Sequence, residues 1–283
     1  MRLSLAFSPD SDDLFMFWPL LRGKVDAGPY TFEHVRADTQ QLNEAAKRGT
    51  YDVLAISIAT YPHVRDRYLL LPHGGSVGRG YGPVVVASKP TALADLAGKR
   101  IGVPGLGTTA YLVLRTLLPD FEPVVLPISP FSRSFDAVRS GEVDAALLIH
   151  EGRLTYEREG LARVVDIGEG WAAATGGLPI PLGGNAIRRD LGDEVIRDVS
   201  SRLAESIRWA LAHRDELMQA LLDEEARPEV GLSRDLLDRY LAMYANDDTA
   251  GYPPDAREAC ERLVRDGVRL GIYSEGARIE WAP

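Results

Sequence analysis

The sequence contains a single cysteine, Cys260, among its 283 residues. A lone cysteine cannot form a disulfide within the chain, and zinc sites built from several cysteines are excluded as well. The residues around Cys260 have a helical pattern, which favours a buried and inert thiol over a reactive one. No two histidines have the spacing of metal ligands, so we expect no bound metal.

Basic residues are also in short supply, and long apolar runs are absent. Lysine and arginine total 32 against 41 aspartates and glutamates, for a net charge of −9. Nucleic-acid-binding proteins usually carry a basic patch, and a membrane helix needs about 20 apolar residues in a row, so we expect neither partner. The first residues read MRLSLAFSP, which lacks the apolar core of a signal peptide, and a cytoplasmic location is therefore expected.

What the sequence does contain is an alternation of short apolar runs and helical patterns, which is typical of an α/β fold. Strands are expected at 2–7, 30–37, 52–58, 84–87, 100–103, 124–126, 143–149 and 164–167. Helices are expected between them at 13–21, 39–48, 93–96, 108–118 and 131–140. After a passage rich in glycine and proline, the last hundred residues show four helices, at 194–213, 214–222, 233–244 and 254–270.

The order of these elements predicts two lobes. A similar β-α-β-α-β arrangement occurs twice, and the final helices have no sheet of their own, so they must pack on an earlier one. We therefore expect a first lobe of residues 1–88 and 186–283, and a second lobe of 89–185 inserted into it. Ligands in such folds bind in the central cleft, at the carboxyl ends of the strands.

The segment Ser8–Asp13, which reads SPDSDD, lies between the first expected strand and the first helix. Backbone N–H groups at a helix N-terminus can bind an anion, although Ser11 or Asp12 could simply cap the helix. Three aspartates would repel an anionic ligand but could accept hydrogen bonds from sugar hydroxyls. A strand-to-helix turn in this type of fold faces the cleft, so ligand contact remains open beside capping.

Two further segments carry hydroxyl groups near the ends of expected strands. Ser57 lies in the apolar run of the third strand, and it either caps the next turn or points into the cleft. Thr108 and Thr109 follow a strand and a glycine turn. Hydroxyls combined with helix N-terminal amides are typical of a carboxylate or phosphate cradle, and the alternative is an ordinary helix cap.

His150 follows the apolar strand expected at 143–149. A histidine titrates near neutral pH and can act as a general base, whereas a histidine at a strand end is often only a structural hydrogen bonder. Its expected place at the cleft, opposite the paired threonines, favours the catalytic role. Glu151 could orient the ring only if the chain kinks, because neighbours on a strand point to opposite faces.

Six ordered blocks include most of these segments, and the resemblance they carry extends from about residue 3 to the last helix. They read SPxxxDxFxF (8–17), GGxxGRGxGP (74–83), VPGxxTTAY (103–111), IHExRxTY (149–156), LPxPLGG (178–184) and RRDLG (188–192). In this order they resemble the 1,4-dihydroxy-6-naphthoate synthase family of the futalosine route to menaquinone. The chain departs from the usual family pattern at its SPDSDD segment, where SPCPND is common, at Ala55, where lysine is common, and at Gly107.

The resemblance implies a two-lobed fold of the type II periplasmic-binding-protein shape. It implies a carbon–carbon lyase that cleaves a small carboxylate substrate, cyclic dehypoxanthine futalosine, to 1,4-dihydroxy-6-naphthoate and a sugar-derived fragment without a cofactor. It assigns the general base to His150. It places substrate contacts on Ala55, Ile56, Ser57, Thr108 and Thr109.

Two other functions are compatible with the same fold. A non-catalytic solute-binding protein of a transporter would use the same cleft, but it would normally need a secretion signal or a lipid anchor. A sister enzyme of the chorismate dehydratase type would share fold and pathway, although the Thr-Thr and His-Glu blocks favour the synthase. The helices of the last hundred residues could also form the face of a homodimer.

Overall fold

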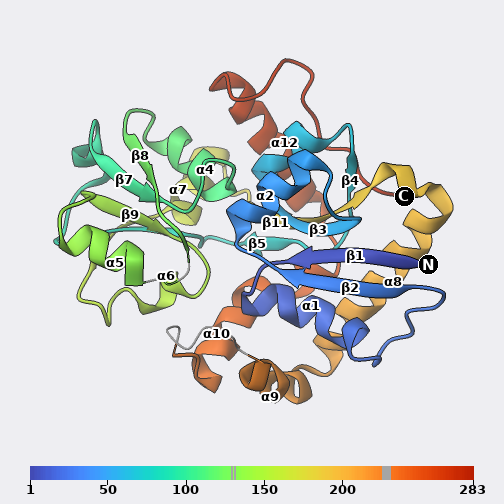
Figure 1. Ribbon diagram of the computed structural model, residues 1–283. Helices are drawn as coiled ribbons and strands as arrows, with labels where there is room; N and C mark the ends of the chain where they lie inside the picture. Colours follow the sequence, from blue (N-terminus) through green and yellow to red (C-terminus); the bar gives the residue numbers. More distant parts are fainter. Residues whose placement is uncertain (129, 131, 225–230) are drawn as a thin grey trace.

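The computed structural model, which describes residues 1–128, 130, 132–224 and 231–283, has two lobes with one β-sheet each (Figure 1). The first sheet has the strand order β2-β1-β3-β11-β4, and β5 also pairs with β11. Its strands are β1 (Arg2–Phe7), β2 (Thr31–Arg36), β3 (Val53–Ser57), β4 (Tyr68–Leu70), β5 (Ser76–Gly78) and β11 (Ile180–Arg188). The two-lobed binding-protein fold expected from the sequence is confirmed.

The second sheet has the strand order β10-β6-β9-β7-β8. Its strands are β6 (Val84–Ala87), β7 (Arg100–Val103), β8 (Glu122–Val125), β9 (Ala145–Leu148) and β10 (Ala162–Asp166). In both sheets the strands linked by helices run parallel, and the strands by which the chain changes lobes run antiparallel to them.

Helices cover both faces of each sheet. The first lobe carries α1 (Ser11–Leu21), α2 (Thr39–Arg48), α3 (Tyr61–Val64), α8 (Asp193–Ala212), α9 (Arg214–Glu224), α10 (Arg234–Tyr244), α11 (Asp247–Ala250) and α12 (Pro254–Arg269). The second carries α4 (Thr109–Leu117), α5 (Ser132–Arg139), α6 (Gly152–Thr155) and α7 (Ile167–Thr175). Short 3-10 turns occupy Ile58–Thr60, Leu93–Leu96 and Arg189–Leu191. Figure 1 shows both chain ends on the first lobe.

Strand β1 shows how the apolar pattern places a strand inside the molecule. Leu3, Leu5 and Phe7 face a core that includes α1, α8 and α10, whereas Ala6 faces a core shared with α2 and α12. Side chains alternate between the faces of a strand, so a nearly continuous apolar run is buried on both sides. Strand β1 is therefore an inner strand of its sheet, and its carboxyl end points towards the second lobe (Figure 1).

The ends of α2 are defined by local sequence. The Asp38 side chain accepts a hydrogen bond from the backbone N–H of Gln40, and Gln41 completes a capping box. At the other end Gly49 takes a left-handed conformation with φ 69°, which suits a residue without a side chain. The helix therefore starts at the cleft with a fixed orientation.

Strand β11 was not among the strands expected from the sequence. Its residues 180–188 include Pro181, Gly183 and Gly184, which indicate a turn when considered alone. In the structure the register with β5 shifts between Pro181 and Gly183, and a bulge of this kind tolerates proline inside a sheet. A Cβ at Gly184 would lie 2.6 Å from the Tyr252 hydroxyl oxygen, so glycine is required there by close packing.

The chain changes sheet a few residues before each of the expected lobe boundaries at 88/89 and 185/186. Strand β6 already pairs with β9 and β10 in the second sheet, and β11 pairs with β3 in the first sheet. The helix expected at 131–140 begins at Ser132 among the described residues, and Phe131 lies outside them. Among the described residues, no helix combines the length and apolar character needed to cross a membrane.

Candidate active site

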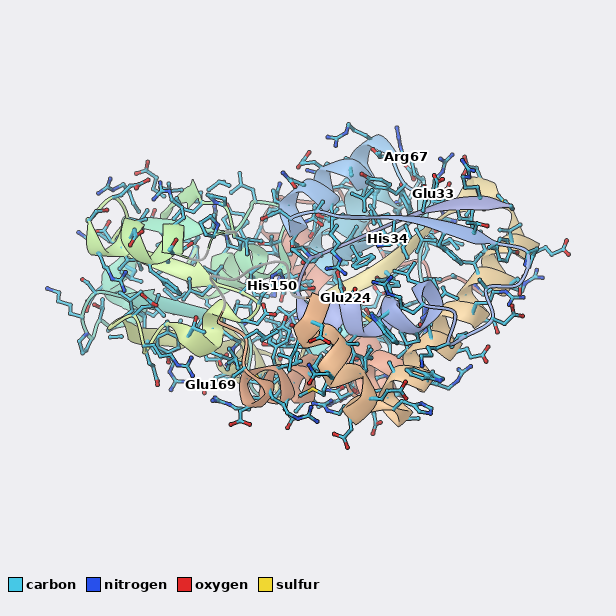
Figure 2. All side chains as sticks on the ribbon, turned by 60° about the horizontal axis from the view of Figure 1, so that its bottom comes forward. Glu33, His34, Arg67, His150, Glu169 and Glu224 are labelled. Carbon is cyan, nitrogen blue, oxygen red and sulfur yellow. The ribbon has the colours of Figure 1, made fainter. Side chains whose placement is uncertain are left out.

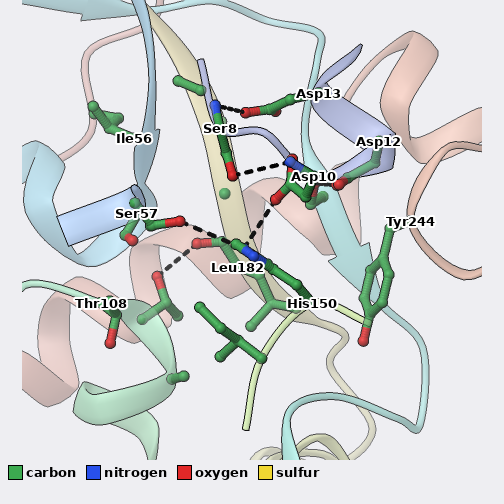
Figure 3. Close-up of a pocket in the computed structure, with 18 of the residues that line it drawn as sticks. Ser8, Asp10, Asp12, Asp13, Ile56, Ser57, Thr108, His150, Leu182 and Tyr244 are labelled. Carbon is green, nitrogen blue, oxygen red and sulfur yellow. Dashed lines mark hydrogen bonds and ion pairs between the residues drawn. The ribbon is translucent and has the colours of Figure 1, made fainter. Parts of the chain in front are cut away.

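The site lies where carboxyl ends of parallel strands from both sheets approach one another. Strands β1 and β3 contribute from the first lobe, and β7 and β9 contribute from the second. A pocket at this position is lined by residues that follow each of these strands (Figure 3). The pocket holds about 700 Å³ of space, its open mouth included, which lies in the usual range for small-molecule sites.

The structure brings every site residue expected from the sequence into this one pocket. The lining includes Ala55, Ile56, Ser57, Thr108, Thr109 and His150. These residues are separated by up to about a hundred positions in the chain, and only the packing of the two lobes brings them together.

Ser57 ends β3 and is held by Asn43 of α2. The Asn43 amide donates to the Ser57 hydroxyl at 3.1 Å, and the Ser57 backbone N–H donates to the Asn43 side-chain oxygen at 2.9 Å. Asn43 is fully buried. This reciprocal pair fixes the end of β3 at the pocket wall, because a buried polar group without a partner would cost about 1–3 kcal/mol.

The paired threonines have distinct protein partners. Thr108 caps α4, since its hydroxyl accepts from the backbone N–H of Tyr111. The Thr109 hydroxyl donates to the Leu182 carbonyl at 2.8 Å and accepts from the backbone N–H of Ala59 at 3.1 Å, both in the first lobe. The turn thus combines a helix cap, as one interpretation predicted, with a contact between lobes.

The β1–α1 loop and the first turn of α1 contribute a buried acidic cluster. Asp10, Asp12 and Asp13 all line the pocket and are each at most 8% exposed. Asp13 accepts from the backbone N–H of Ser8 at 2.7 Å, and this contact closes the loop. Asp10 occupies the N-cap position of α1 without a side-chain capping bond.

Asp12 is held by two hydroxyl groups from other parts of the first lobe. Ser76 of β5 donates to one carboxyl oxygen at 2.5 Å, and Tyr240 of α10 donates to the other at 3.0 Å. Burial, together with repulsion from Asp10, raises the pKa of Asp12 from 3.8 to about 7. Burial and the same aspartates raise the pKa of Asp13 well above 3.8. The cluster therefore holds protons at neutral pH.

His150 lies where the two lobes meet (Figure 2). Its backbone has φ 53°, which makes it the non-glycine residue with positive φ in the described part of the chain. The chain therefore kinks directly after the strand, which is the condition under which Glu151 could orient the ring. The ring nitrogen Nε2 lies 2.9 Å from a carboxyl oxygen of Asp10 and 3.4 Å from the Thr39 hydroxyl.

The electrostatics around His150 favour its protonated form. Burial lowers the pKa of the imidazole, but the Asp10 carboxylate, helped by Glu151 and Asp12, outweighs burial and raises the pKa from 6.5 to about 9. The carboxylate at 2.9 Å from the ring belongs to Asp10, whereas Glu151 accepts from the backbone and hydroxyl of Ser11 at 3.3 Å and 2.8 Å. His150 and Glu151 thus contact two successive residues, Asp10 and Ser11, at the start of α1.

Several lining residues were missed when the sequence was considered alone. Tyr240 and Tyr244 lie one turn apart on α10, and Tyr244 and His150 both line the pocket (Figure 3). Their spacing of four residues predicts a common helix face, but nothing in the sequence connects that face to the expected site residues, all of which lie at or before His150. Ser76 lies in the glycine-rich block at 74–83, which carries no catalytic pattern of its own.

Metal binding has no structural support in the described ranges. They contain no group of three or more histidine, cysteine, aspartate or glutamate side chains arranged to hold a metal ion. Asp12 instead accepts hydrogen bonds from two hydroxyl groups, and Asp10 pairs with His150.

Two lobes, each with a sheet and helices on both faces, and a pocket between them define the class of periplasmic-binding-protein-like folds. The alkanesulfonate-binding protein SsuA from Xanthomonas axonopodis pv. citri superposes with a TM-score of 0.70 at 18% identity, over 97% of this chain and 94% of that one. A Candida albicans protein described as having the generic periplasmic binding protein fold gives 0.66 at 14% identity, over 100% and 99%. At these identities the likeness concerns the fold alone.

The sequence pattern of the family described as "Menaquinone biosynthesis" matches residues 3–268, and the chain belongs to this family. A 1,4-dihydroxy-6-naphthoate synthase from Thermus thermophilus is 38% identical over 98% of this chain and 97% of that protein. The enzyme of the same name from Streptomyces coelicolor is 37% identical over 95% and 94%. A crystal structure of an Archaeoglobus fulgidus protein superposes with a TM-score of 0.87 at 42% identity, over 96% and 98%.

Proposed function

We propose that this protein is a 1,4-dihydroxy-6-naphthoate synthase, a carbon–carbon lyase that converts cyclic dehypoxanthine futalosine to 1,4-dihydroxy-6-naphthoate. The observation that carries the proposal is the alignment of nearly the whole chain with two relatives of that name. Because the match includes both lobes, it includes all the strands that end at the pocket.

The composition of the pocket supports a bicyclic carboxylate as the substrate. Apolar walls come from Leu42, Ile56 and Leu182, and tyrosines lie on the α10 side. Flat apolar and aromatic walls suit a ring system, since aromatic groups gain from edge or offset stacking. The N-terminus of α4, which begins after Thr108, supplies backbone N–H groups of the kind that bind a carboxylate.

In the proposed reaction His150 is the general base. It accepts the proton of a hydroxyl group on the sugar-derived part of the substrate, and the oxygen then forms a carbonyl. The adjacent carbon–carbon bond breaks, and its electron pair passes to a ring carbonyl oxygen, which takes up a proton as the naphthoate becomes aromatic. No external oxidant or reductant enters this balance. Orientation by a closed pocket and the gain in aromaticity both lower the barrier.

The test is turnover of cyclic dehypoxanthine futalosine under anaerobic conditions by the wild-type protein and by two variants of His150. His150→Asn is the main variant, because asparagine tolerates a left-handed backbone better than most residues; His150→Ala is the second. We expect product from the wild type and a fall of about 10²–10⁴-fold in kcat for both variants, as is typical for loss of a general base. Mass spectrometry of the naphthoate follows the reaction.

His213→Asn is the matched control, since this exposed histidine ends α8 and stacks on Trp209 far from the pocket. Near-normal turnover by His150→Asn would contradict the assignment of His150 as the general base. Wild-type protein that releases no naphthoate yet is stabilised by the substrate would favour the solute-binding alternative. Turnover of chorismate instead of cyclic dehypoxanthine futalosine would favour an enzyme of the chorismate dehydratase type.

The proposal includes a cytoplasmic location, where a biosynthetic enzyme meets diffusible metabolites. Fractionation of cells that express the full-length gene checks this point. Recovery of the protein from the periplasm or the medium would contradict it.

A further inference from the structure

Asp10 and His150 form an ion-pair contact that spans the two lobes. Asp10 follows β1 in the first lobe, and His150 follows β9 in the second. Their side chains are 6% and 15% exposed, and the Asp10 oxygen lies 2.9 Å from Nε2 of the ring. A contact so short and so buried between two lobes is stronger and less screened by salt than an ion pair on the surface.

We propose that Asp10 is a positioning residue that holds the proton on Nε2 of His150, presents Nδ1 to the substrate, and does so only when the two lobes are closed. This inference rests on the proposed role of His150 as the base. A histidine has two ring nitrogens, and a carboxylate on one of them fixes the tautomer and leaves the other to accept a proton. Asp10 would then act through His150 without touching the reacting atoms.

A second contact between the lobes lies next to the first, and it supports the proposal that the Asp10–His150 pair forms when the lobes close. Ser11 donates to the fully buried Glu151 through its hydroxyl at 2.8 Å and through its backbone N–H at 3.3 Å. Two successive residues of one lobe thus hold two successive residues of the other. The left-handed backbone of His150 is uncommon for a residue with a side chain, and it persists only where the surroundings determine it. The β1–α1 loop supplies such surroundings.

The charged and titratable groups around the ring come from four elements. Asp10 and Asp12 face it from the β1–α1 loop and the first turn of α1, and Glu151 comes from its own loop. Tyr240 and Tyr244 of α10 line the same pocket. Arg36 and Asp38, before α2, line the adjoining groove, which His150 also borders. Apart from Arg36, the charged groups of this set are acidic, so their joint effect is to stabilise a proton on the ring.

Closure therefore changes the strength of the base. With Asp10 in contact, the pKa of the ring is about 9; because the Asp10 carboxylate is the main group that raises this pKa against burial, loss of the contact lowers it. A neutral ring that becomes a stronger base as the pocket closes gains its proton from the substrate, because closure also excludes water. The cross-lobe contact would in this way couple substrate enclosure to proton abstraction.

The test measures the pKa of the His150 ring by NMR in the full chain, with the signal assigned from its loss in His150→Asn. We expect Asp10→Asn to lower this pKa by at least one unit, both in the free protein and with 1,4-dihydroxy-6-naphthoate bound. Asp52→Asn is the matched control, since Asp52 accepts from Ser4 in the same lobe and does not line the pocket; it should leave the pKa unchanged. An unchanged pKa in Asp10→Asn under both conditions overturns the proposal.

Kinetics separate positioning from a merely structural role. We expect Asp10→Asn to lower kcat tenfold or more and to shift the acid limb of the kcat–pH profile to lower pH, with a smaller change in KM. In a His150→Asn background the same substitution should cost nothing further in kcat, since residues that act through one another are not additive. An equal loss in both backgrounds overturns the proposal. Absence of any synthase activity, with the NMR shift intact, would instead refute the proposed function and leave the Asp10–His150 pairing in place.

Discussion

Asp12 illustrates how one buried side chain makes stability depend on pH. Its pKa in the folded protein is about 7, against 3.8 for an exposed aspartate, because burial and Asp10 disfavour the charge. A carboxyl group whose folded pKa is raised contributes its stability in full below the unfolded value, near pH 4. That contribution is lost as the pH rises through about 7. Above pH 7 the ionised group costs the fold on the order of a few kcal/mol.

Asp12→Asn should therefore stabilise the protein at pH 8 and have little effect at pH 4, because an amide cannot ionise. Ser76 and Tyr240 can still pair with the amide, since hydroxyl groups both donate and accept. The measurement is the free energy of unfolding of both proteins in denaturant across this pH range. The same difference between the two proteins at pH 4 and pH 8 would mean that Asp12 does not titrate in between.

His150 shows how much of a site residue a sequence reveals. Its position after an apolar strand predicted a histidine at the cleft, and the structure places it in the pocket; its catalytic role stays a prediction. The partner at its ring could not be predicted, because Asp10 lies 140 positions away and on the other lobe. Adjacent Glu151 was the nearer candidate along the chain, and in the structure it accepts hydrogen bonds from Ser11. Tertiary contacts decided which carboxylate meets the ring at 2.9 Å.

Strand β11 is the element on which both sheet and pocket depend. It pairs with β3, β4 and β5, and its residues Leu182, Gly183 and Gly184 line the pocket. Prediction missed it because glycine and proline indicate turns locally. In the folded chain the same residues serve a bulge and a close approach to a neighbouring side chain.

Gly184→Ala should destabilise the protein by about 1–3 kcal/mol, the usual cost of overpacking. The new Cβ would lie 2.6 Å from the Tyr252 hydroxyl and 3.0 Å from a methyl group of Ile58. Gly251→Ala is the control, since a Cβ there meets nothing closer than 3.8 Å. Denaturant unfolding of both variants measures the difference. Equal stability of the Gly184 variant and the wild type would show that this packing can relax freely.

Because the pocket lies between the two lobes, it exists only in the folded protein, and ligand binding can be measured as an increase in stability. A ligand that binds only the folded protein stabilises it by about 2.7 kcal/mol at a concentration of one hundred times its Kd. We expect 1,4-dihydroxy-6-naphthoate to raise the melting temperature in proportion to the logarithm of its concentration. Thermal unfolding with increasing ligand checks this, with benzoate as a smaller carboxylate for comparison. A melting temperature that does not respond to the naphthoate would contradict its place in this pocket.

The homodimer suggested by the helices of the last hundred residues stays a prediction, and sedimentation of the purified protein measures it. Helices α8, α9, α10 and α12 bury one face each on the first lobe, and their other faces are exposed. Only the concentration dependence of the sedimentation coefficient can distinguish a solvated face from a dimer face.

The sequence by itself determined the α/β class, the alternation of strands and helices along the chain, and the six blocks that indicate the family. These features follow from local rules, because apolar periodicity, caps and glycine turns act within a few residues. Tertiary structure alone decided the pairing of β11, the place of Tyr240 and Tyr244 in the pocket, and the contact of Asp10 with His150. Each of these joins residues that are far apart in the chain, so its energy exists only once distant segments have packed together, and for Asp10 and His150 those segments belong to different lobes.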